Sequence, residues 1–232
     1  MYKSEFGCAR MDPGTRAFYD RDPEGYASTT FGGDVSPIRA RFVRLLNPGA
    51  RILDLGCGSG RDTLAFIGEG FDVTAVDGSE GMCRVASERI GLRVRNIDFT
   101  ELDYGSEFDG VWACASLLHL RPGELPHVLS LIRAALVDGG ILYMSFKLGR
   151  FSGMRDGRWY TDMDPEGTVG LAEGAGFSTV DVWESTDPRG TVWVNGIFRK
   201  IRRRTSKAYP WPSRGLDARK WTVLRTVPAC VP

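Results

Sequence analysis

A glycine-rich turn beside acidic residues is the part of this sequence best suited to bind a ligand. Residues 51–62 read Arg-Ile-Leu-Asp-Leu-Gly-Cys-Gly-Ser-Gly-Arg-Asp, so Asp54 precedes Gly56, Gly58 and Gly60. Alternate glycines let a backbone turn tightly and approach a ligand closely, because no Cβ intervenes. The spacing fits neither the Gly-x-Gly-x-x-Gly fingerprint of dinucleotide sites nor a Walker loop, since the chain has no Gly-Lys pair. The Asp54 carboxylate would repel pyrophosphate but suits an ammonium or sulfonium group.

A second acidic residue follows at the end of the next apolar segment. The run Phe71–Asp77 predicts a strand whose last residue stands 21 residues after Gly56. In nucleotide-binding α/β folds an acid at about this spacing binds the hydroxyl groups of the ribose. The two acids and the glycines together favour a nucleoside that is cationic rather than phosphorylated. S-adenosylmethionine is the common metabolite of that description.

At these residues the chain resembles the class I S-adenosylmethionine-dependent methyltransferases. The first motif of that family has an acid-x-Gly-x-Gly-x-Gly pattern, and its second strand ends in an acid. The run Leu136–Leu142, which reads Leu-Val-Asp-Gly-Gly-Ile-Leu, is similar to the family's motif before its fifth strand. The run Gly58–Asp62 resembles small bacterial members that include the tellurite-resistance type. The resemblance covers about residues 16–200 and implies S-adenosylmethionine as the cofactor, with no metal ion required.

The resemblance also implies which residues contact the cofactor. Asp54 would face the methionine end, Asp77 the ribose, and Asp98 with Phe99 the adenine. Each has an alternative: Asp54 could cap its turn, and Asp77 and Asp98 could be surface acids. Tyr19 and Tyr26 belong to a segment that folds over the cofactor in such relatives. The complete expected set is Asp54, Gly56, Cys57, Gly58, Gly60, Asp77, Gly78, Met82, Asp98, Phe99, Ala115, Tyr19 and Tyr26.

Two residues are candidates for catalysis. Ser116 and His119 follow the predicted fourth strand, where the acceptor must meet the methyl group. Methyl transfer from sulfonium chiefly needs alignment, and a base is needed only where the nucleophile carries a proton. His119 could be that base, with a pKa near neutrality, or a packed histidine. Arg61 begins a helix, where its charge opposes the dipole, so we expect it to pair with Asp54 or Asp77 or to face the substrate.

Polar and aromatic residues beyond the predicted fifth strand are candidates for binding the methyl acceptor. They are Lys147, Arg158, Tyr160, Arg189 and Trp193, and we expect the first three to lie in a loop of residues 147–160. The basic side chains could pair with an acidic group of the substrate or be solvated charges. Residues 113–119 lack the Asn/Asp-Pro-Pro-Tyr/Phe motif of enzymes that methylate amino groups of DNA bases. We therefore expect a small molecule with an O, S or N nucleophile.

The charges of the chain are unevenly distributed. Residues 201–232 hold eight basic residues and one acidic residue, whereas the whole chain of 232 residues has a formal charge of +1. Residues 1–200 are therefore acidic overall, and their composition predicts no surface that binds the phosphate backbone of a nucleic acid. The basic segment, which includes Trp211 and Trp221, leaves open an RNA methyltransferase that uses it as a binding arm. A non-catalytic S-adenosylmethionine-binding module is the other alternative.

The order of apolar and helical segments predicts an α/β fold: a doubly wound, mostly parallel seven-stranded sheet with helices on both faces and a terminal antiparallel hairpin. We expect a flexible N-terminus at 1–14, a methyltransferase domain at 15–200 that begins with a helical segment at 15–27, and a basic tail at 201–232. The five cysteines are scattered, and no apolar run approaches the roughly 20 residues of a membrane span. With no signal peptide visible, this favours a cytoplasmic monomer or homodimer without membrane association.

Overall fold

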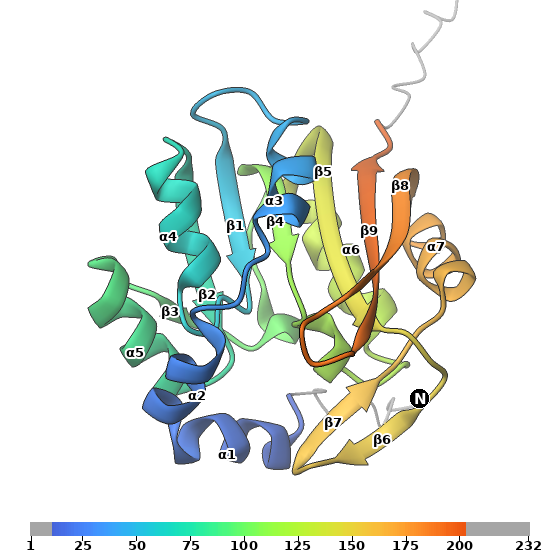
Figure 1. The fold of residues 1–232 in the computed structure, drawn as a ribbon. Helices are drawn as coiled ribbons and strands as arrows, with labels where there is room; N and C mark the ends of the chain where they lie inside the picture. The colour runs from blue at the N-terminus through green and yellow to red at the C-terminus, as the bar shows by residue number, and fades with distance from the viewer. Residues whose placement is uncertain (1–10, 203–232) are drawn as a thin grey trace, which may run out of the picture. The chain divides into compact units, whose positions relative to one another are not determined.

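Seven strands form one sheet, in the order β3-β2-β1-β4-β5-β9-β8 (Figure 1). The computed structural model describes residues 11–202, so the predicted basic tail lies outside the described residues except for its first two positions. Neighbouring strands from β3 to β5 are parallel, whereas β9 is antiparallel to both β5 and β8. The strands are β1 (Arg51–Leu55), β2 (Asp72–Asp77), β3 (Arg95–Asn96), β4 (Phe108–Ala113), β5 (Leu136–Lys147), β8 (Phe177–Thr186) and β9 (Val192–Lys200). The predicted doubly wound sheet with a terminal antiparallel hairpin is confirmed.

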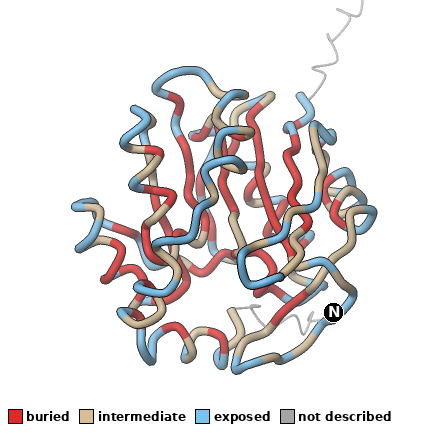
Figure 2. The backbone as a smooth tube through the Cα atoms, in the orientation of Figure 1, coloured by how far each residue is buried: buried red, intermediate tan, exposed pale blue. Residues whose placement is uncertain are grey.

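Helices cover both faces of this sheet, so that its strands form the buried layer (Figure 2). On one face Phe42 and Phe66 pack against Trp112, with ring centroids 5.2 and 5.5 Å from the indole. These rings come from α3 (Ser36–Val43), α4 (Arg61–Gly68) and β4. The other face is covered by α6 (Leu125–Ala135) and α7 (Pro165–Gly174). The remaining helices are α1 (Pro13–Arg21), α2 (Pro23–Thr30) and α5 (Glu80–Ile90), with short 3-10 turns at Phe99–Glu101 and Leu117–His119.

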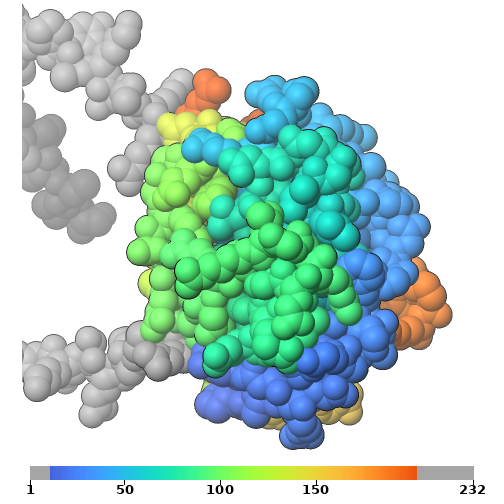
Figure 3. Space-filling view, turned by 90° about the vertical axis from the view of Figure 1, so that its left-hand side faces the viewer, coloured from blue at the N-terminus to red at the C-terminus, as the bar shows by residue number. Residues whose placement is uncertain are grey.

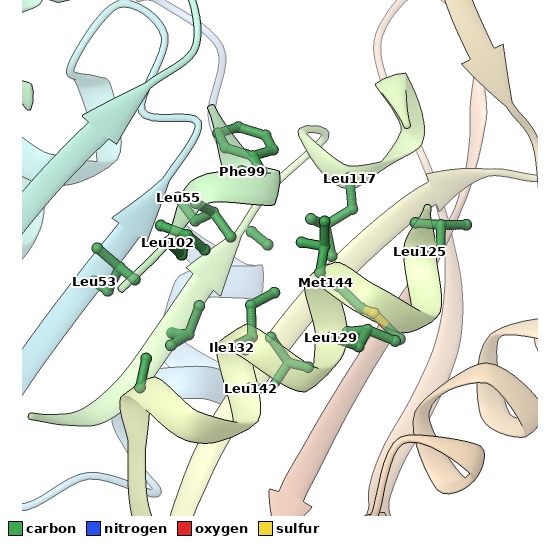
Figure 4. Close-up of a cluster of buried hydrophobic side chains, with 14 of the residues drawn as sticks. Leu53, Leu55, Phe99, Leu102, Leu117, Leu125, Leu129, Ile132, Leu142 and Met144 are labelled. Carbon is green, nitrogen blue, oxygen red and sulfur yellow. The ribbon is translucent and has the colours of Figure 1, made fainter. Parts of the chain in front are cut away.

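The apolar residues of α6 show why the second layer forms. Leu125, Leu129 and Ile132 are spaced so that they share one face of the helix, and all three are buried. Figure 4 shows these side chains directed at Leu142 and Met144 of β5. Burying each such side chain stabilises the fold by about 1.5–3 kcal/mol. This packing fixes β4 and β5, whose carboxyl ends form part of the cavity described below.

The predicted loop at residues 147–160 is wrong, because most of it forms a second, two-stranded sheet. Its strands are β6 (Ser152–Arg155) and β7 (Arg158–Thr161), which pair antiparallel. The connecting Asp156 and Gly157 have φ of 52° and 77°. Such left-handed turns match the twist of a hairpin and favour the Asp-Gly dipeptide. The sequence signal was therefore present, but the basic and aromatic composition obscured it.

The N-terminal helical segment is divided into two helices. Asp22 ends α1, and its carboxylate accepts a hydrogen bond from the Gly25 amide at the start of α2, where Pro23 is the first residue. These helices pack against α5 through Tyr19, Ala27, Met82 and Val85. In the space-filling view the N-terminal residues, in blue, lie against the green surface that includes α5 (Figure 3). Within residues 11–202, no helix has the length and apolar character needed to cross a membrane.

Candidate active site

A cavity of about 680 Å³ opens at the carboxyl ends of the parallel strands. Open α/β sheets bind their ligands at this edge, where the strand order reverses, here between β1 and β4. Fourteen of the residues predicted from the sequence line the cavity: Tyr19, Tyr26, Asp54, Gly56, Cys57, Gly58, Asp77, Met82, Phe99, Ala115, Ser116, His119, Arg189 and Trp193. The other predicted residues, Gly60, Gly78, Asp98, Lys147, Arg158 and Tyr160, do not contribute to its lining.

The glycine turn between β1 and α4 forms one wall of the cavity. Gly56 and Gly58 have φ of 79° and 53°, in the left-handed region that glycine adopts without strain. A Cβ atom at Gly56 would lie 2.4 Å from Cβ of Ser116, so that position also requires glycine for space. At Gly58 a Cβ atom would meet nothing within 4 Å. The turn therefore presents bare backbone to the cavity at Gly58.

Asp54 is a buried acid at the end of β1. Its Oδ2 accepts a hydrogen bond from the Thr63 hydroxyl at 2.5 Å, and its other oxygen accepts none from the described residues. Burial, with a smaller contribution from the negative charge of Asp62, raises the pKa of Asp54 to about 7. A cation in the cavity would offset this cost of ionisation. The site therefore favours a ligand with a positive charge near Asp54.

Asp77 is held rigidly where β2 ends. Its two carboxylate oxygens accept hydrogen bonds from the amides of Gly58 and Ser79, both at 2.9 Å. Burial raises the pKa of Asp77, although these amide hydrogen bonds oppose the shift. Asp20 of α1 accepts from the Ser79 hydroxyl at 2.6 Å, which ties the N-terminal helices to this corner. The carboxylate is thus pre-positioned beside the glycine turn.

The structure does not bring Asp98 to the cavity. Its Oδ2 accepts from the Met11 amide at 2.7 Å and from the Arg16 guanidinium at 3.2 Å, while Oδ1 accepts from the Thr100 amide. These contacts hold the N-terminal segment on the sheet edge and occupy the carboxylate that was expected to face adenine. Phe99, its neighbour, does line the cavity. Two predicted glycines also do not line the cavity. A Cβ atom at Gly60 would meet the Ile90 side chain, and one at Gly78 would meet the Met11 side chain.

The two catalytic candidates lie together in the cavity wall, but His119 differs from the expectation. Its Nδ1 lies 2.7 Å from the Trp159 carbonyl oxygen and its Nε2 lies 2.8 Å from the Tyr19 hydroxyl. A carbonyl oxygen only accepts, so Nδ1 carries the proton and Nε2 accepts from Tyr19. Burial, helped by the charges of Arg158 and Lys147, lowers the pKa of His119 to about 4, although the hydrogen bond to Trp159 opposes it. The expected near-neutral pKa is therefore wrong.

Ser116 carries a polar atom without a protein partner. Its Oγ is buried and has no hydrogen bond in the described part of the chain. The side chain lies against Gly56 and faces the same cavity as Asp54. Buried hydroxyl groups are normally hydrogen-bonded, so an unpaired one in a cavity indicates a position for a ligand atom.

Arg61 pairs with neither Asp54 nor Asp77, so of the three expected alternatives only a position facing the substrate remains. Its Nε and Nη2 donate to the two oxygens of the adjacent Asp62, at 3.1 and 2.7 Å. Asp62 also accepts from the indole nitrogen of Trp112 at 3.0 Å. This neighbouring acid compensates the arginine at the start of α4. Both members of the pair line the cavity.

At the far side of the cavity, Tyr143 and Ser185, which sequence reasoning missed, form a polar group with Asn195, which the sequence placed in the terminal hairpin as a candidate for specificity. The Tyr143 hydroxyl donates to Oδ1 of Asn195 at 2.8 Å, and Nδ2 of Asn195 donates to the Ser185 hydroxyl at 2.9 Å. All three residues line the cavity, as does Ser145. Polar residues within otherwise apolar strands were the signal available in the sequence. Near the same side, the Arg189 guanidinium donates to the Thr29 carbonyl at 3.3 Å and so links the β8–β9 loop to α2.

Comparisons with known proteins agree with this arrangement. A family model described as a methyltransferase domain matches residues 52–140. A ubiquinone biosynthesis O-methyltransferase of Xanthomonas campestris is 32% identical over 123 residues, which cover 48% of this chain and 49% of the relative. The chain thus spans about half the length of these curated relatives.

Solved structures resemble a larger part of the chain. The 1,6-didemethyltoxoflavin-N1-methyltransferase of Burkholderia thailandensis, with bound 1,6-didemethyltoxoflavin and S-adenosylhomocysteine, has a TM-score of 0.69 and 26% identity, covering 81% of this chain and 87% of its own. A [4+2]-cyclase shares the fold, with a TM-score of 0.65 and 18% identity over 80% of this chain and 94% of its own. The fold alone therefore does not decide the reaction. The glycine turn, the sheet order and these matches together show a methyltransferase domain that is similar to the class I S-adenosylmethionine-dependent methyltransferases.

Proposed function

We propose that this protein transfers a methyl group from S-adenosylmethionine to a small-molecule acceptor that offers an O, S or N nucleophile. One observation carries the proposal: a single cavity joins the glycine turn and its buried acids to a compartment of aromatic and polar side chains. The first part suits a cationic nucleoside and the second suits a small organic molecule. The relatives support this, because one is named as an O-methyltransferase of ubiquinone biosynthesis and another contains a small heterocycle with S-adenosylhomocysteine.

The residues present fit the proposed cofactor. Asp54 has one oxygen free to face a positive charge, Ser116 has an unpaired hydroxyl, and Gly58 leaves open space. In the proposal Asp77 binds the ribose hydroxyls, while Met82 and Phe99 flank the adenine. When bound, S-adenosylmethionine supplies an electrophilic methyl group on a sulfonium centre. The chain's own task is to align the acceptor with that group and to exclude water.

His119 is proposed to position Tyr19 rather than to remove a proton. The low pKa of His119 keeps the imidazole neutral at physiological pH, and its Nε2 already accepts from the Tyr19 hydroxyl. Burial raises the pKa of Tyr19 well above its ordinary value, so the phenol also stays neutral. Neither group is a base ready to act near pH 7. The proposed chemistry therefore depends on alignment by the cavity wall, including Ser116 and Tyr19.

The domain division, the cytoplasmic location and the monomeric or homodimeric state remain proposals. We keep a methyltransferase domain at 15–200, flanked by an N-terminal segment at 1–14 and a basic tail at 201–232. The RNA methyltransferase alternative depends on that tail, which lies outside the described residues from position 203 onward. The alternative of a non-catalytic binding module predicts cofactor binding without turnover on any acceptor.

Calorimetry with S-adenosylmethionine, followed by an assay for S-adenosylhomocysteine formation, tests the proposed function. Asp77→Asn should weaken cofactor binding by about 1–3 kcal/mol, because a buried hydrogen-bond partner of the ribose is altered. Asp98→Asn is the matched control: it removes a similar charge from an acid outside the cavity, so it should lower stability but leave cofactor affinity nearly unchanged. Equal losses of affinity in both variants, or none in Asp77→Asn, would contradict the assignment of Asp77.

A further inference from the structure

A pair of cationic side chains lies beside the cavity without carboxylate partners among residues 11–202. Lys147 is the last residue of β5, and its Nζ lies 4.2 Å from the centroid of the Tyr160 ring. Arg158 is the first residue of β7, and its guanidinium carbon lies 5.2 Å from the same ring and 4.2 Å from the Phe18 ring. Aromatic faces attract both cations but do not neutralise them.

Arg155, a third cation beside the Tyr160 ring, is paired with a carboxylate. The guanidinium carbon of Arg155 lies 4.5 Å from the Tyr160 ring, and its two terminal nitrogens donate to both oxygens of Asp162, at 2.9 and 3.1 Å. Within residues 11–202, neither Lys147 nor Arg158 has an acidic oxygen within 4 Å. The Nε of Arg158 is buried and has no hydrogen-bond partner there either. In the described part of the chain, two positive charges around one ring thus lack a directly paired carboxylate.

Both cations lie next to the aromatic and polar compartment of the cavity, where the methyl acceptor is proposed to bind. Side chains alternate along a strand, so Lys147 shares a face of β5 with Tyr143 and Ser145, which line the cavity. In the register with β9, Lys147 lies opposite Trp193, which also lines it. The guanidinium carbon of Arg158 lies 5.9 Å from the ring of Tyr19, another lining residue. The pair therefore lies at the rim, just beyond Tyr19 and Trp193.

We propose that Lys147 and Arg158 bind an acidic group, a carboxylate or phosphate, of the methyl acceptor. This rests on the proposed function and names the class of its substrate as an organic anion. The two cations repel each other, and an anion between them would relieve that repulsion and accept a hydrogen bond from the unpaired Nε–H of Arg158. The acids that line the cavity, among them Asp54, Asp62 and Asp77, would otherwise disfavour an anionic molecule. Burial, together with the charges of Arg155 and Arg158, lowers the pKa of Lys147, although the more distant Asp162 and Asp156 oppose the shift.

The test uses the full chain loaded with S-adenosylhomocysteine and a pair of probes that differ in charge, benzoate and benzamide. Calorimetry should show that benzoate binds about tenfold more tightly, because charge-assisted hydrogen bonds are the stronger ones. Lys147→Gln and Arg158→Gln should each abolish this preference, whereas Lys147→Arg should keep it. Arg93→Gln is the matched control, since it removes one exposed positive charge beside β3, an edge strand of the sheet that is not adjacent to β5. It should leave the preference unchanged.

Inorganic phosphate distinguishes an acceptor site from a general anion site. Phosphate should compete with benzoate in the parent chain and bind more weakly than benzoate, because it lacks a ring to enter the cavity. Phosphate that binds as tightly as benzoate, equal affinity for the two aromatic probes, a preference that survives both glutamine variants, or no binding of any anion would overturn the proposal. Binding of S-adenosylhomocysteine is measured in the same samples. If it persists while the anion results fail, only the substrate class is wrong; if it is absent, the proposed function itself fails.

Discussion

The Tyr19 hydroxyl lies 2.8 Å from Nε2 of His119, a hydrogen bond between side chains 100 residues apart in the sequence. It joins α1 to the turn after β4 and so closes one wall of the cavity. Because the ring's other nitrogen is bound to the Trp159 carbonyl, the same imidazole also fixes β7. One buried histidine thus links the N-terminal helices, the second sheet and the turn after β4.

Replacing His119 should affect stability and alignment rather than proton transfer. His119→Leu leaves the Tyr19 hydroxyl and the Trp159 carbonyl without partners, at a cost of about 1–3 kcal/mol for each buried group. Tyr19→Phe removes only the hydroxyl and should cost less. If both act through their mutual hydrogen bond, their effects on the KM for S-adenosylmethionine should not add in the double variant. Additive effects would contradict a positioning role.

The pH dependence of stability gives a separate test of His119. In the unfolded chain the imidazole binds a proton near pH 6.5, whereas burial lowers its pKa in the folded protein to about 4. The contribution of the neutral His119 to the free energy of unfolding is therefore complete above pH ~6.5. It is lost as the pH falls toward 4, by ~3 kcal/mol in total. Urea unfolding of the parent and His119→Leu chains should show this difference in slope between those pH values. If instead the rate of methyl transfer fell on acidification with a midpoint near pH 6.5, in the parent chain and not in His119→Leu, His119 would act as a base.

Cofactor binding should become weaker as the pH falls below 7. Asp54 has a pKa of about 7 because it is buried, with Asp62 nearby, while Thr63 and Arg61 oppose the shift. A cationic ligand prefers the ionised carboxylate, so affinity should fall by up to about tenfold per pH unit below 7. The stability of the ligand-free fold depends on pH in the opposite direction. Because the pKa of Asp54 is raised in the folded protein, its protonated form stabilises the fold at low pH, and this stabilisation is lost as the pH rises through 7. Calorimetry in buffers of different ionisation enthalpy should detect proton release on binding near pH 6, and Asp54→Asn should abolish it. A proton count unchanged in that variant would show that another group titrates.

The two glycines of the turn should fail in different ways. Gly56→Ala introduces a Cβ atom 2.4 Å from that of Ser116 in a left-handed conformation, so we expect destabilisation of about 2–5 kcal/mol. Gly58→Ala has the same conformational strain, about 1–2 kcal/mol, but open space. Gly58→Val should therefore fold and lose cofactor affinity, because its side chain enters the cavity. Thermal unfolding and calorimetry separate the outcomes, and equal melting temperatures for Gly56→Ala and Gly58→Ala would contradict this account.

The sequence predicted the elements that local signals specify. The strand that ends at Asp77, the glycine turn after Asp54 and the helix that begins at Arg61 agree with the expectation, because apolar runs and glycines mark where each begins or ends. Those elements also carry most of the cofactor residues, including Asp54, Gly58 and Asp77. Their positions follow from the rule that parallel strands present their carboxyl ends at one edge.

Long-range partners explain what the sequence could not predict. Asp98 was expected to face the cavity, but its carboxylate binds the Met11 amide, 87 residues away in the chain. The pKa of His119 likewise depends on burial by α1 and β7, which no local pattern specifies. Lys147 and Arg158 were expected in a loop, yet they lie on two different sheets around one tyrosine ring. In each case the partner is chosen by tertiary packing rather than by spacing along the chain.

The most direct measurement follows the methyl group itself. The full chain is incubated with S-adenosylmethionine bearing an isotopically labelled methyl group and a cell extract separated into small molecules, RNA and protein, and each fraction is analysed by mass spectrometry. We predict label in the small-molecule fraction, lost in Asp77→Asn and retained after truncation following Lys200. Label found only in RNA and dependent on residues 201–232, or no label in any fraction despite calorimetric binding of S-adenosylmethionine, would contradict the central claim.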